Sequence, residues 1–268
     1  MENKKQSSDI VYSCYYNSSR EGEHFVPEHT LSYVIAGSLT LNDSSKEYPS
    51  RNGTFRLIRR NQLIKFEKQP PQKGEFKSLS IYLNQQILKK ISIEYGIYAD
   101  HTPKDKSVYE LKINAPVKTY INSLLDYRDN GTLNNQQLIE LKIKEAILLL
   151  LQINPDLKNI LFDFSEPHKI DLEAFMNKNY HFNVHLDRFA YLTGRSLATF
   201  KRDFEKWFRM TPGKWLLQKR LQEAYYLITQ KGKKASDIYL DLGFEDLSHF
   251  SYAFKKQFGS APSKISTE

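Results

Sequence analysis

The fold is decided by residues 236–259, which read SDIYLDLGFEDLSHFSYAFKKQFG. Gly243 predicts a tight turn between two helices, because glycine readily adopts the left-handed backbone conformation that such a turn needs. Asp246 is placed to cap the second helix by accepting hydrogen bonds from its free amides. An apolar stripe at three- and four-residue spacing runs along that helix: Leu247, Phe250, Phe254 and Phe258. The stretch therefore predicts a helix-turn-helix whose second helix is buried on one side.

The same design occurs earlier in the chain, at residues 186–204, which read LDRFAYLTGRSLATFKRDF. Gly194 again predicts the turn, and Ser196 is placed to cap the second helix. The stripe of this helix consists of Leu197, Phe200, Phe204 and Phe208. A long connecting helix is indicated by the apolar residues Leu217, Leu221, Ala224 and Ile228. Such a helix would hold the second helices of the two motifs about 34 Å apart. This distance is about one turn of DNA, so each of these helices could enter a major groove on the same face of a duplex.

The faces opposite the two stripes supply the candidate DNA contacts. Arg202 is the best candidate for reading a base, because its guanidinium can bond two acceptors on guanine, whereas Lys201 is expected to meet phosphate. An ordinary solvated face is the alternative. The candidate DNA-binding residues are Ser196, Ala198, Thr199, Lys201 and Arg202 in the first motif, and Ser248, His249, Ser251, Tyr252 and Lys255 in the second. We expect Trp207 and Trp215 to lie in the core or to pack between helices.

The distribution of charge favours a polyanionic partner for the C-terminal part. The chain of 268 residues has a formal net charge of +8. Residues 169–268 hold 17 Lys and Arg against 11 Asp and Glu, whereas residues 1–168 hold 22 against 20. The positive excess therefore lies mainly in the part that contains both motifs.

The N-terminal part has a different texture. Residues 11–83 contain short β-branched and aromatic runs, such as Leu31–Ile35 and Phe55–Ile58, separated by turn clusters. This pattern predicts a small antiparallel β-sandwich or barrel. From residue 87 to residue 162 the apolar spacing becomes helical.

The C-terminal part resembles the AraC/XylS transcription regulators over about residues 183–262. The resemblance rests on the run LGFEDLSHFSYAFKKQFGSAP at 242–262, and on Phe189-Ala190, Gly194-x-Ser196, Phe200-x-Arg202-x-Phe204, Thr211-Pro212 and Arg220-Leu221-x-x-Ala224. It implies a transcription regulator with two helix-turn-helix motifs, often fused to an N-terminal barrel of the cupin kind; we expect an activator, with a repressor as the alternative. Two features depart from the family pattern: Tyr239 stands where alanine is usual, and Ser263-Lys264-Ile265 replaces the usual Tyr-Arg. The first departure indicates a tilted or loosely docked second motif.

These observations define the expected architecture. The fold class is α+β, with an N-terminal cupin-like antiparallel β-barrel or sandwich with helices and a C-terminal all-α domain. The expected boundaries are 1–162 for a regulatory and dimerisation domain, 163–170 for a linker and 171–268 for the double helix-turn-helix. The expected partners are double-stranded DNA, a second copy of the chain and RNA polymerase. No cofactor is expected, and a small-molecule or protein effector is left open.

The sequence leaves two alternative function classes, a metal-dependent enzyme and an architectural DNA-binding protein. A metal-dependent cupin-like enzyme needs clustered histidines with a carboxylate, commonly including a His-x-His pair, and neither His24 nor His29 belongs to such a pair. His181 and His185 stand four residues apart, but no glutamate lies between them as in the zinc-protease motif. An architectural DNA-binding protein is disfavoured by the large, nearly neutral N-terminal part. Cys14, the single cysteine, is expected to be a buried thiol. The chain shows neither a signal peptide nor an apolar run that spans a bilayer, so we expect a cytoplasmic protein.

The segment from Gln137 to Ile153 is too apolar for a simple surface helix. One stripe, expected to pack on the β-domain, consists of Ile139, Ile143, Ala146, Leu150 and Ile153. Leu138, Leu141 and Leu148 fall on the opposite side. A neighbouring helix at Val117–Leu125 is one candidate to cover them. The other candidate is a second subunit, and we expect these three leucines to form a homodimer interface.

Overall fold

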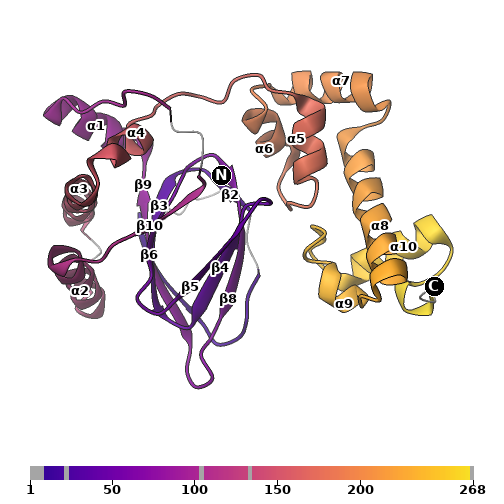
Figure 1. Ribbon diagram of the computed structural model, residues 1–268, viewed down its shortest axis with the longest axis horizontal. Helices are drawn as coiled ribbons and strands as arrows, with labels where there is room; N and C mark the ends of the chain where they lie inside the picture. Colours follow the sequence, from indigo (N-terminus) through magenta and orange to yellow (C-terminus); the bar gives the residue numbers. More distant parts are fainter. Residues whose placement is uncertain (1–8, 21–23, 103–105, 132–134, 266–268) are drawn as a thin grey trace. The chain divides into compact units, whose positions relative to one another are not determined.

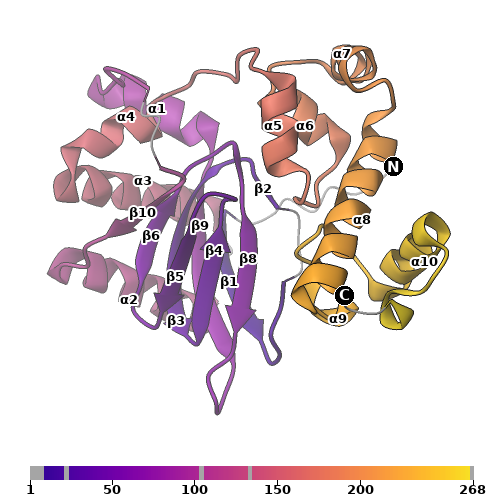
Figure 2. The ribbon, with the colours of Figure 1, turned by 45° about the vertical axis from the view of Figure 1, so that its right-hand side comes forward.

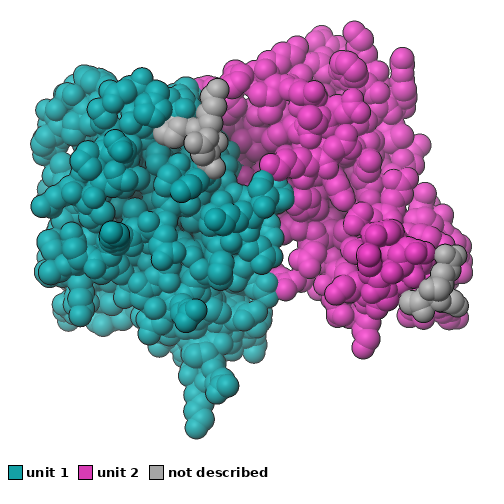
Figure 3. All heavy atoms as spheres, in the orientation of Figure 1, with its two compact units in different colours: residues 1–19, 26–62, 66–165 teal, residues 20–25, 63–65, 166–268 magenta. Residues whose placement is uncertain are grey.

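The structure, a computed structural model, describes residues 9–20, 24–102, 106–131 and 135–265. It consists of two compact units, shown in Figure 3. Unit 1 comprises residues 1–19, 26–62 and 66–165, and unit 2 comprises residues 20–25, 63–65 and 166–268. Among the described helices, none is long and apolar enough to cross a membrane.

The framework of unit 1 is antiparallel β-structure, as predicted. The five-stranded sheet has the order β1 (Ile10–Tyr15), β9 (Phe76–Leu83), β3 (His29–Ala36), β6 (Phe55–Ile58) and β10 (Val108–Leu111). The three-stranded sheet has the order β5 (Glu47–Arg51), β4 (Ser38–Asn42) and β8 (Lys65–Gln69), and β2 (Phe25–Val26) pairs with β7 (Gln62–Leu63). Figures 1 and 2 show β4, β5 and β8 lying over one side of the larger sheet.

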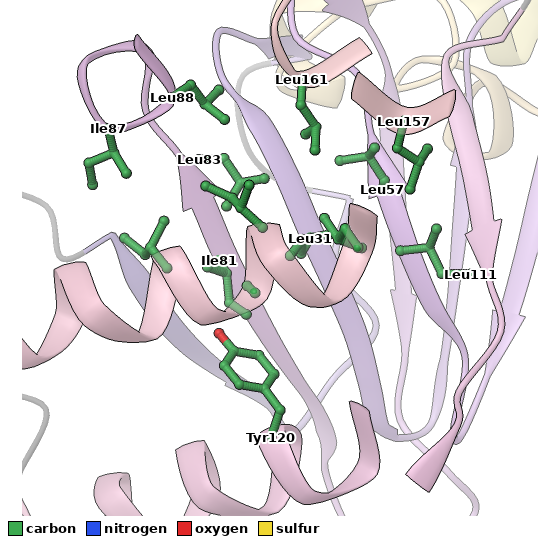
Figure 4. Packing of buried hydrophobic residues seen from close by; sticks show 14 of the residues in the cluster. Leu31, Leu57, Ile81, Leu83, Ile87, Leu88, Leu111, Tyr120, Leu157 and Leu161 are labelled. Carbon is green, nitrogen blue, oxygen red and sulfur yellow. The ribbon is translucent and has the colours of Figure 1, made fainter. Parts of the chain in front are cut away.

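Helices cover the other side of the larger sheet. They are α1 (Gln85–Tyr95), α2 (Ala115–Asp129), α3 (Gln136–Ile153), the short turn η2 (Pro155–Leu157) and α4 (Lys158–Leu161). Side chains alternate between the two faces of a strand, and the register places Leu31 opposite both Leu57 and Ile81. Figure 4 shows these three side chains in the same core as Tyr120 of α2. Unit 1 is therefore a sheet with a helical layer sealed by one hydrophobic core.

The two faces of α3 differ as predicted. The stripe of Ile139, Ile143, Ala146 and Leu150 is buried against the sheet and its neighbours. On the outer face Leu141 is 63% exposed and Leu148 is 37% exposed. The neighbouring helix α2 packs beside α3, where the hydroxyl of Tyr120 donates to the carbonyl of Lys142 at 2.9 Å. Helix α2 thus leaves Leu141 and Leu148 accessible.

The prediction for Cys14 is wrong. This residue lies on the edge strand β1 and is exposed. Its thiol donates a hydrogen bond to Oε2 of Glu75 at 2.7 Å. Because side chains alternate along a strand, Cys14 shares a face of β1 with Ile10; Ile10 is buried in the core at one end of the strand, and the core does not extend as far as Cys14 at the other end.

Unit 2 is helical, in agreement with the predicted all-α part. Its elements are α5 (Leu172–Asn179), α6 (Leu186–Leu192), α7 (Leu197–Phe208), α8 (Pro212–Lys231), α9 (Ala235–Ile238), α10 (Leu247–Phe258) and the short turn η3 (Pro262–Lys264). Figures 1 and 2 show α8 running from the group α5–α7 to the pair α9 and α10. Two short segments from the N-terminal half belong to this unit, because Phe25 and Leu63 are buried in the same cluster as Phe189.

Candidate nucleic-acid interface

The turn of the first helix-turn-helix lies at Gly194, between α6 and α7. Its φ of 65° is in the left-handed region, as predicted. A Cβ atom here would lie 2.3 Å from the backbone of His168, so the position excludes side chains for a second reason. Ser196 caps α7, since its hydroxyl accepts a hydrogen bond from the amide of Thr199 at 3.2 Å. The predicted turn and cap are both confirmed.

The inner face of α7 is aromatic. Phe200 and Phe204 are inaccessible to water, and the ring of Phe204 lies 5.5 Å from that of Trp215, between centroids. Phe208 is half-buried and lies 4.8 Å from the same indole. The predicted stripe is wrong at Leu197, which is 39% exposed. As the first helical residue, Leu197 precedes the turns of α7 that carry the core contacts.

The outer face of α7 presents the predicted candidates together. Ala198, Lys201 and Arg202 are exposed, and Ser196 is exposed at the cap. Thr199 is half-buried, and its side-chain oxygen accepts a hydrogen bond from the hydroxyl of Ser196 at 3.0 Å. The beginning of α7 therefore carries a polar and basic surface over a packed aromatic face.

Arg202 is held only loosely within the protein. Its side chain is 78% exposed, and its guanidinium lies 3.6 Å from Oδ1 of Asp203. Arg195, whose side chain is 6% exposed, donates to Oδ2 of the same carboxylate at 3.1 Å. This hydrogen bond is the main cause that holds the pKa of Asp203 below its usual value. Arg195 neutralises Asp203, which leaves the Arg202 guanidinium free to find another acceptor.

The second helix-turn-helix has the same construction. Gly243 has a φ of 86°, and a Cβ atom there would lie 2.8 Å from the carbonyl oxygen of His181. Asp246 caps α10, accepting the amide of His249 at 2.6 Å. Phe250 and Phe254 are inaccessible to water, as predicted. The turn and cap predicted for this motif are therefore also confirmed.

On the outer face of α10, Ser248, His249, Tyr252 and Lys255 are exposed, whereas Ser251 is half-buried. The imidazole of His249 lies edge-on to the ring of Phe244, 5.8 Å between centroids. The half-buried position of Ser251 leaves it less accessible than its neighbours. The outer face of α10 is thus less basic and more aromatic than that of α7.

Sequence reasoning missed one feature that the two motifs share. Leu247, the first residue of α10, is 38% exposed, like Leu197 at the start of α7. Helical spacing predicts both leucines to be part of the buried stripes. A leucine at the N-terminal end of a recognition helix can contact the methyl group of thymine in the major groove. The signal available in the sequence was the position itself, directly after each cap.

The two tryptophans have different environments. Trp215 of α8 is 5% exposed, so its predicted packing role is confirmed. Trp207 is 66% exposed, so the prediction that it packs between helices is wrong. Trp215 occupies the space against Phe204 and Phe208, which gives the last turn of α7 its apolar cover without Trp207.

His181 and His185, the two histidines with the spacing of a metal-binding pair, have different environments. Burial lowers the pKa of His181 to about 3. His185 is exposed at the N-terminus of α6. Across the described residues, no group of three or more His, Cys, Asp or Glu side chains is arranged to hold a metal ion.

Comparison with known proteins agrees with this geometry. Residues 189–267 match the model of a helix-turn-helix domain. Residues 29–160 match the model described as the ExsA N-terminal regulatory domain. The second match runs from β3 into α4 of unit 1, and the first runs from Phe189 in α6 through both motifs of unit 2.

Similar proteins extend over nearly the whole chain. The HTH-type transcriptional regulator ExsA of Pseudomonas aeruginosa is 23% identical over 258 residues, which cover 95% of this chain and 91% of the relative. The virulence regulon transcriptional activator VirF of Yersinia enterocolitica is 25% identical, with coverage of 89% and 90%. Among solved structures, ToxT from Vibrio cholerae aligns with a TM-score of 0.44 and 13% identity over 96% of each chain.

The helix-turn-helix match begins at Phe189, which is buried in the first motif, and it includes α7 and α10, the second helices of the two motifs. The regulatory-domain match includes four of the five strands of the larger sheet, β3, β6, β9 and β10, and the helices α1, α2 and α3. This combination, together with the relatives over most of the chain, establishes a DNA-binding regulator with an N-terminal regulatory domain. The chain belongs to the AraC/XylS family of transcription regulators.

Proposed function

We propose that this chain activates transcription by placing α7 and α10 in successive major grooves on one face of DNA. The observation that carries the proposal is the presence of two capped helices with exposed outer faces, linked by the 20-residue helix α8. At about 1.5 Å per residue, α8 is about 30 Å long, close to the pitch of DNA.

The division of roles follows the chemistry of each side chain. Arg202 reads a guanine through two hydrogen bonds, while Lys201 and Lys255 bind phosphate. Ser196, Ala198 and Thr199 complete the surface of the first motif. Ser248, His249, Ser251 and Tyr252 complete that of the second.

The regulatory arrangement is proposed from the relatives. VirF of Yersinia enterocolitica and RhaS of Escherichia coli are named transcriptional activators. We extend activation to this chain, which makes RNA polymerase its second macromolecular partner. Its site of action would be the cytoplasm, where bacterial DNA lies. The protein would act by binding rather than by catalysis, with control exercised through unit 1.

A homodimer is proposed through the outer face of α3. Leu141 and Leu148 are exposed on it, and Leu138 is half-buried beside them. Exposed leucines on one helix face mark an interface, and two-fold pairing is the commonest way to cover such a face. The dimer would place two copies of the chain on adjacent DNA sites.

The test combines selection and transcription. Full-length protein is used to select binding sequences from a random duplex pool, and the recovered site is placed upstream of a reporter promoter for transcription with purified RNA polymerase. We expect one bipartite sequence and a transcript that increases with protein. Recovery of unrelated sequences, or a transcript that does not respond, would refute the proposal.

A further inference from the structure

The two helix-turn-helix motifs are built on separate hydrophobic cores. The first core ends on α8 with Trp215 and Leu216, and the second begins on α8 with Leu221. Among the described residues, the two clusters share no buried member. Each motif is therefore stabilised mainly by its own buried side chains, and α8 is the element that contributes to both cores.

Arg220 lies at the boundary between these cores. Its Nε donates to the carbonyl of Tyr180 at 2.8 Å, and one terminal nitrogen donates to the carbonyl of Phe182 at 2.8 Å. The other terminal nitrogen donates to the carbonyl of Gly243 at 2.8 Å. Tyr180 and Phe182 precede the first motif, whereas Gly243 is the turn of the second. One side chain thus bonds the backbone of both halves.

The turn of the second motif fits closely around this side chain. A Cβ atom at Gly243 would lie 2.9 Å from the guanidinium carbon of Arg220 and 2.8 Å from the carbonyl of His181. Burial lowers the pKa of Arg220 to about 10, so the guanidinium stays charged at neutral pH. Lysine has three N–H donors but carries them on one nitrogen, and the amide of glutamine has two, so neither can reproduce three bonds that leave from three separate nitrogens.

Helix α8 alone does not fix the spacing of the two readers. Long helices curve gently, with radii of about 60–100 Å. For a helix of about 30 Å, a change of about 20° in curvature would move its far end by about 5 Å. This displacement exceeds the step between base pairs, about 3.4 Å.

We propose that Arg220 is a positioning residue that fixes the spacing and orientation of α7 and α10, so that binding depends strictly on the spacing of the two half-sites. The inference rests on the proposed function, because it assumes that both helices read DNA together. Arg220 itself does not touch DNA in this proposal. It acts through the carbonyls of Tyr180, Phe182 and Gly243.

The experiment measures the affinity of the full-length chain for variants of the selected duplex. These duplexes carry both half-sites with the original spacer, both half-sites with one or two base pairs added or removed, or one half-site only. The proteins are wild type, Arg220→Lys and Arg220→Gln, with Lys219→Ala as the matched control that removes a neighbouring cation of α8. Circular dichroism and thermal melting establish that each variant is folded.

For wild type and Lys219→Ala, we expect a change of one base pair in the spacer to weaken binding by about tenfold or more, comparable to the loss of a specific base contact. For both Arg220 variants, we expect this dependence to flatten to about twofold, with affinity for a single half-site unchanged. Loss of binding to the original duplex should then reach about tenfold.

Three results would overturn the inference. Wild type could tolerate spacer changes, folded Arg220 variants could keep the wild-type dependence, or both variants could fail to fold, which would make Arg220 a requirement of the fold itself. Failure of the selection to recover any site would instead refute the proposed function, and the inference with it. A recovered site with no effect of spacing refutes the inference alone.

Discussion

Replacement of Arg202 by alanine is expected to weaken specific DNA binding without destabilising the protein. The side chain is 78% exposed, and its ion pair with Asp203 spans 3.6 Å. Such a surface pair contributes about 0–1 kcal/mol to stability. Asp203 also keeps its hydrogen bond from Arg195 in the variant. The melting temperature should therefore change little.

The effect on DNA binding should be larger. A bidentate contact to guanine contributes about 1–3 kcal/mol of discrimination, which corresponds to about 5-fold to 150-fold in affinity. Affinity for the selected site and for a scrambled duplex would be measured by fluorescence anisotropy. We expect Arg202→Ala to lose affinity for the selected site and to relax preference at one base pair.

Lys201→Ala serves as the control for a phosphate contact. It should weaken both duplexes equally and reduce the slope of log affinity against log salt by about 0.9. If Arg202→Ala also weakened the two duplexes equally, Arg202 would be a phosphate contact and the assigned reading role would be wrong.

Three further outcomes are expected. Phe250→Ala removes a side chain that is 0% exposed in the second core, and should cost about 3–5 kcal/mol in the free energy of unfolding, measured in urea; a cost below about 1 kcal/mol would contradict its place in that core. Replacing Leu141 and Leu148 together by glutamate should give a folded monomer in analytical ultracentrifugation, because both side chains are accessible in the single chain; an unchanged dimer would refute the α3 interface, and an unfolded variant would show that both belong to the core. Burial lowers the pKa of His24 from 6.5 to about 4, so between these pH values the unfolded state binds more protons than the folded state. The free energy of unfolding should therefore be constant above about pH 6.5 and fall as the pH drops below it. His24→Gln keeps an acceptor for the amide of Asn183 and should reduce this loss in pH-dependent melts; an identical pH profile would rule out His24 as its source.

The C-terminal motifs could be predicted in detail because their determinants are local. Each turn needs a glycine with positive φ, and each cap is a side chain that accepts a hydrogen bond from the amide three residues later. Both features depend on only a few neighbouring positions of the chain. The aromatic stripes also obey helical spacing, which fixes Phe200 and Phe250 as core residues. Periodicity does not show where a core ends, however. Leu197 and Leu247 keep the spacing of the stripe but precede the packed turns of their helices.

Contacts between distant segments were beyond the sequence patterns. Phe25 and Leu63 join the core of unit 2, although more than a hundred residues separate each of them from Phe189. Arg220 had been noted only as part of a family motif. Its role depends on hydrogen bonds to three backbone carbonyls. Every residue has a backbone carbonyl, so the sequence does not show which ones Arg220 contacts. The exposure of Trp207 was also beyond the sequence patterns, because the residue type does not show that Trp215 is the indole that packs on Phe204 and Phe208.

The most direct test of the central claim is a contact map of one protein copy on its selected duplex, obtained by guanine methylation interference and phosphate ethylation interference. We expect two clusters of major-groove contacts on one face of the DNA, with centres about 10–10.5 base pairs apart. Arg202→Ala should remove one guanine from the first cluster, and the second cluster should persist. A single cluster, or two clusters on opposite faces of the duplex, would contradict the claim that α7 and α10 read successive major grooves.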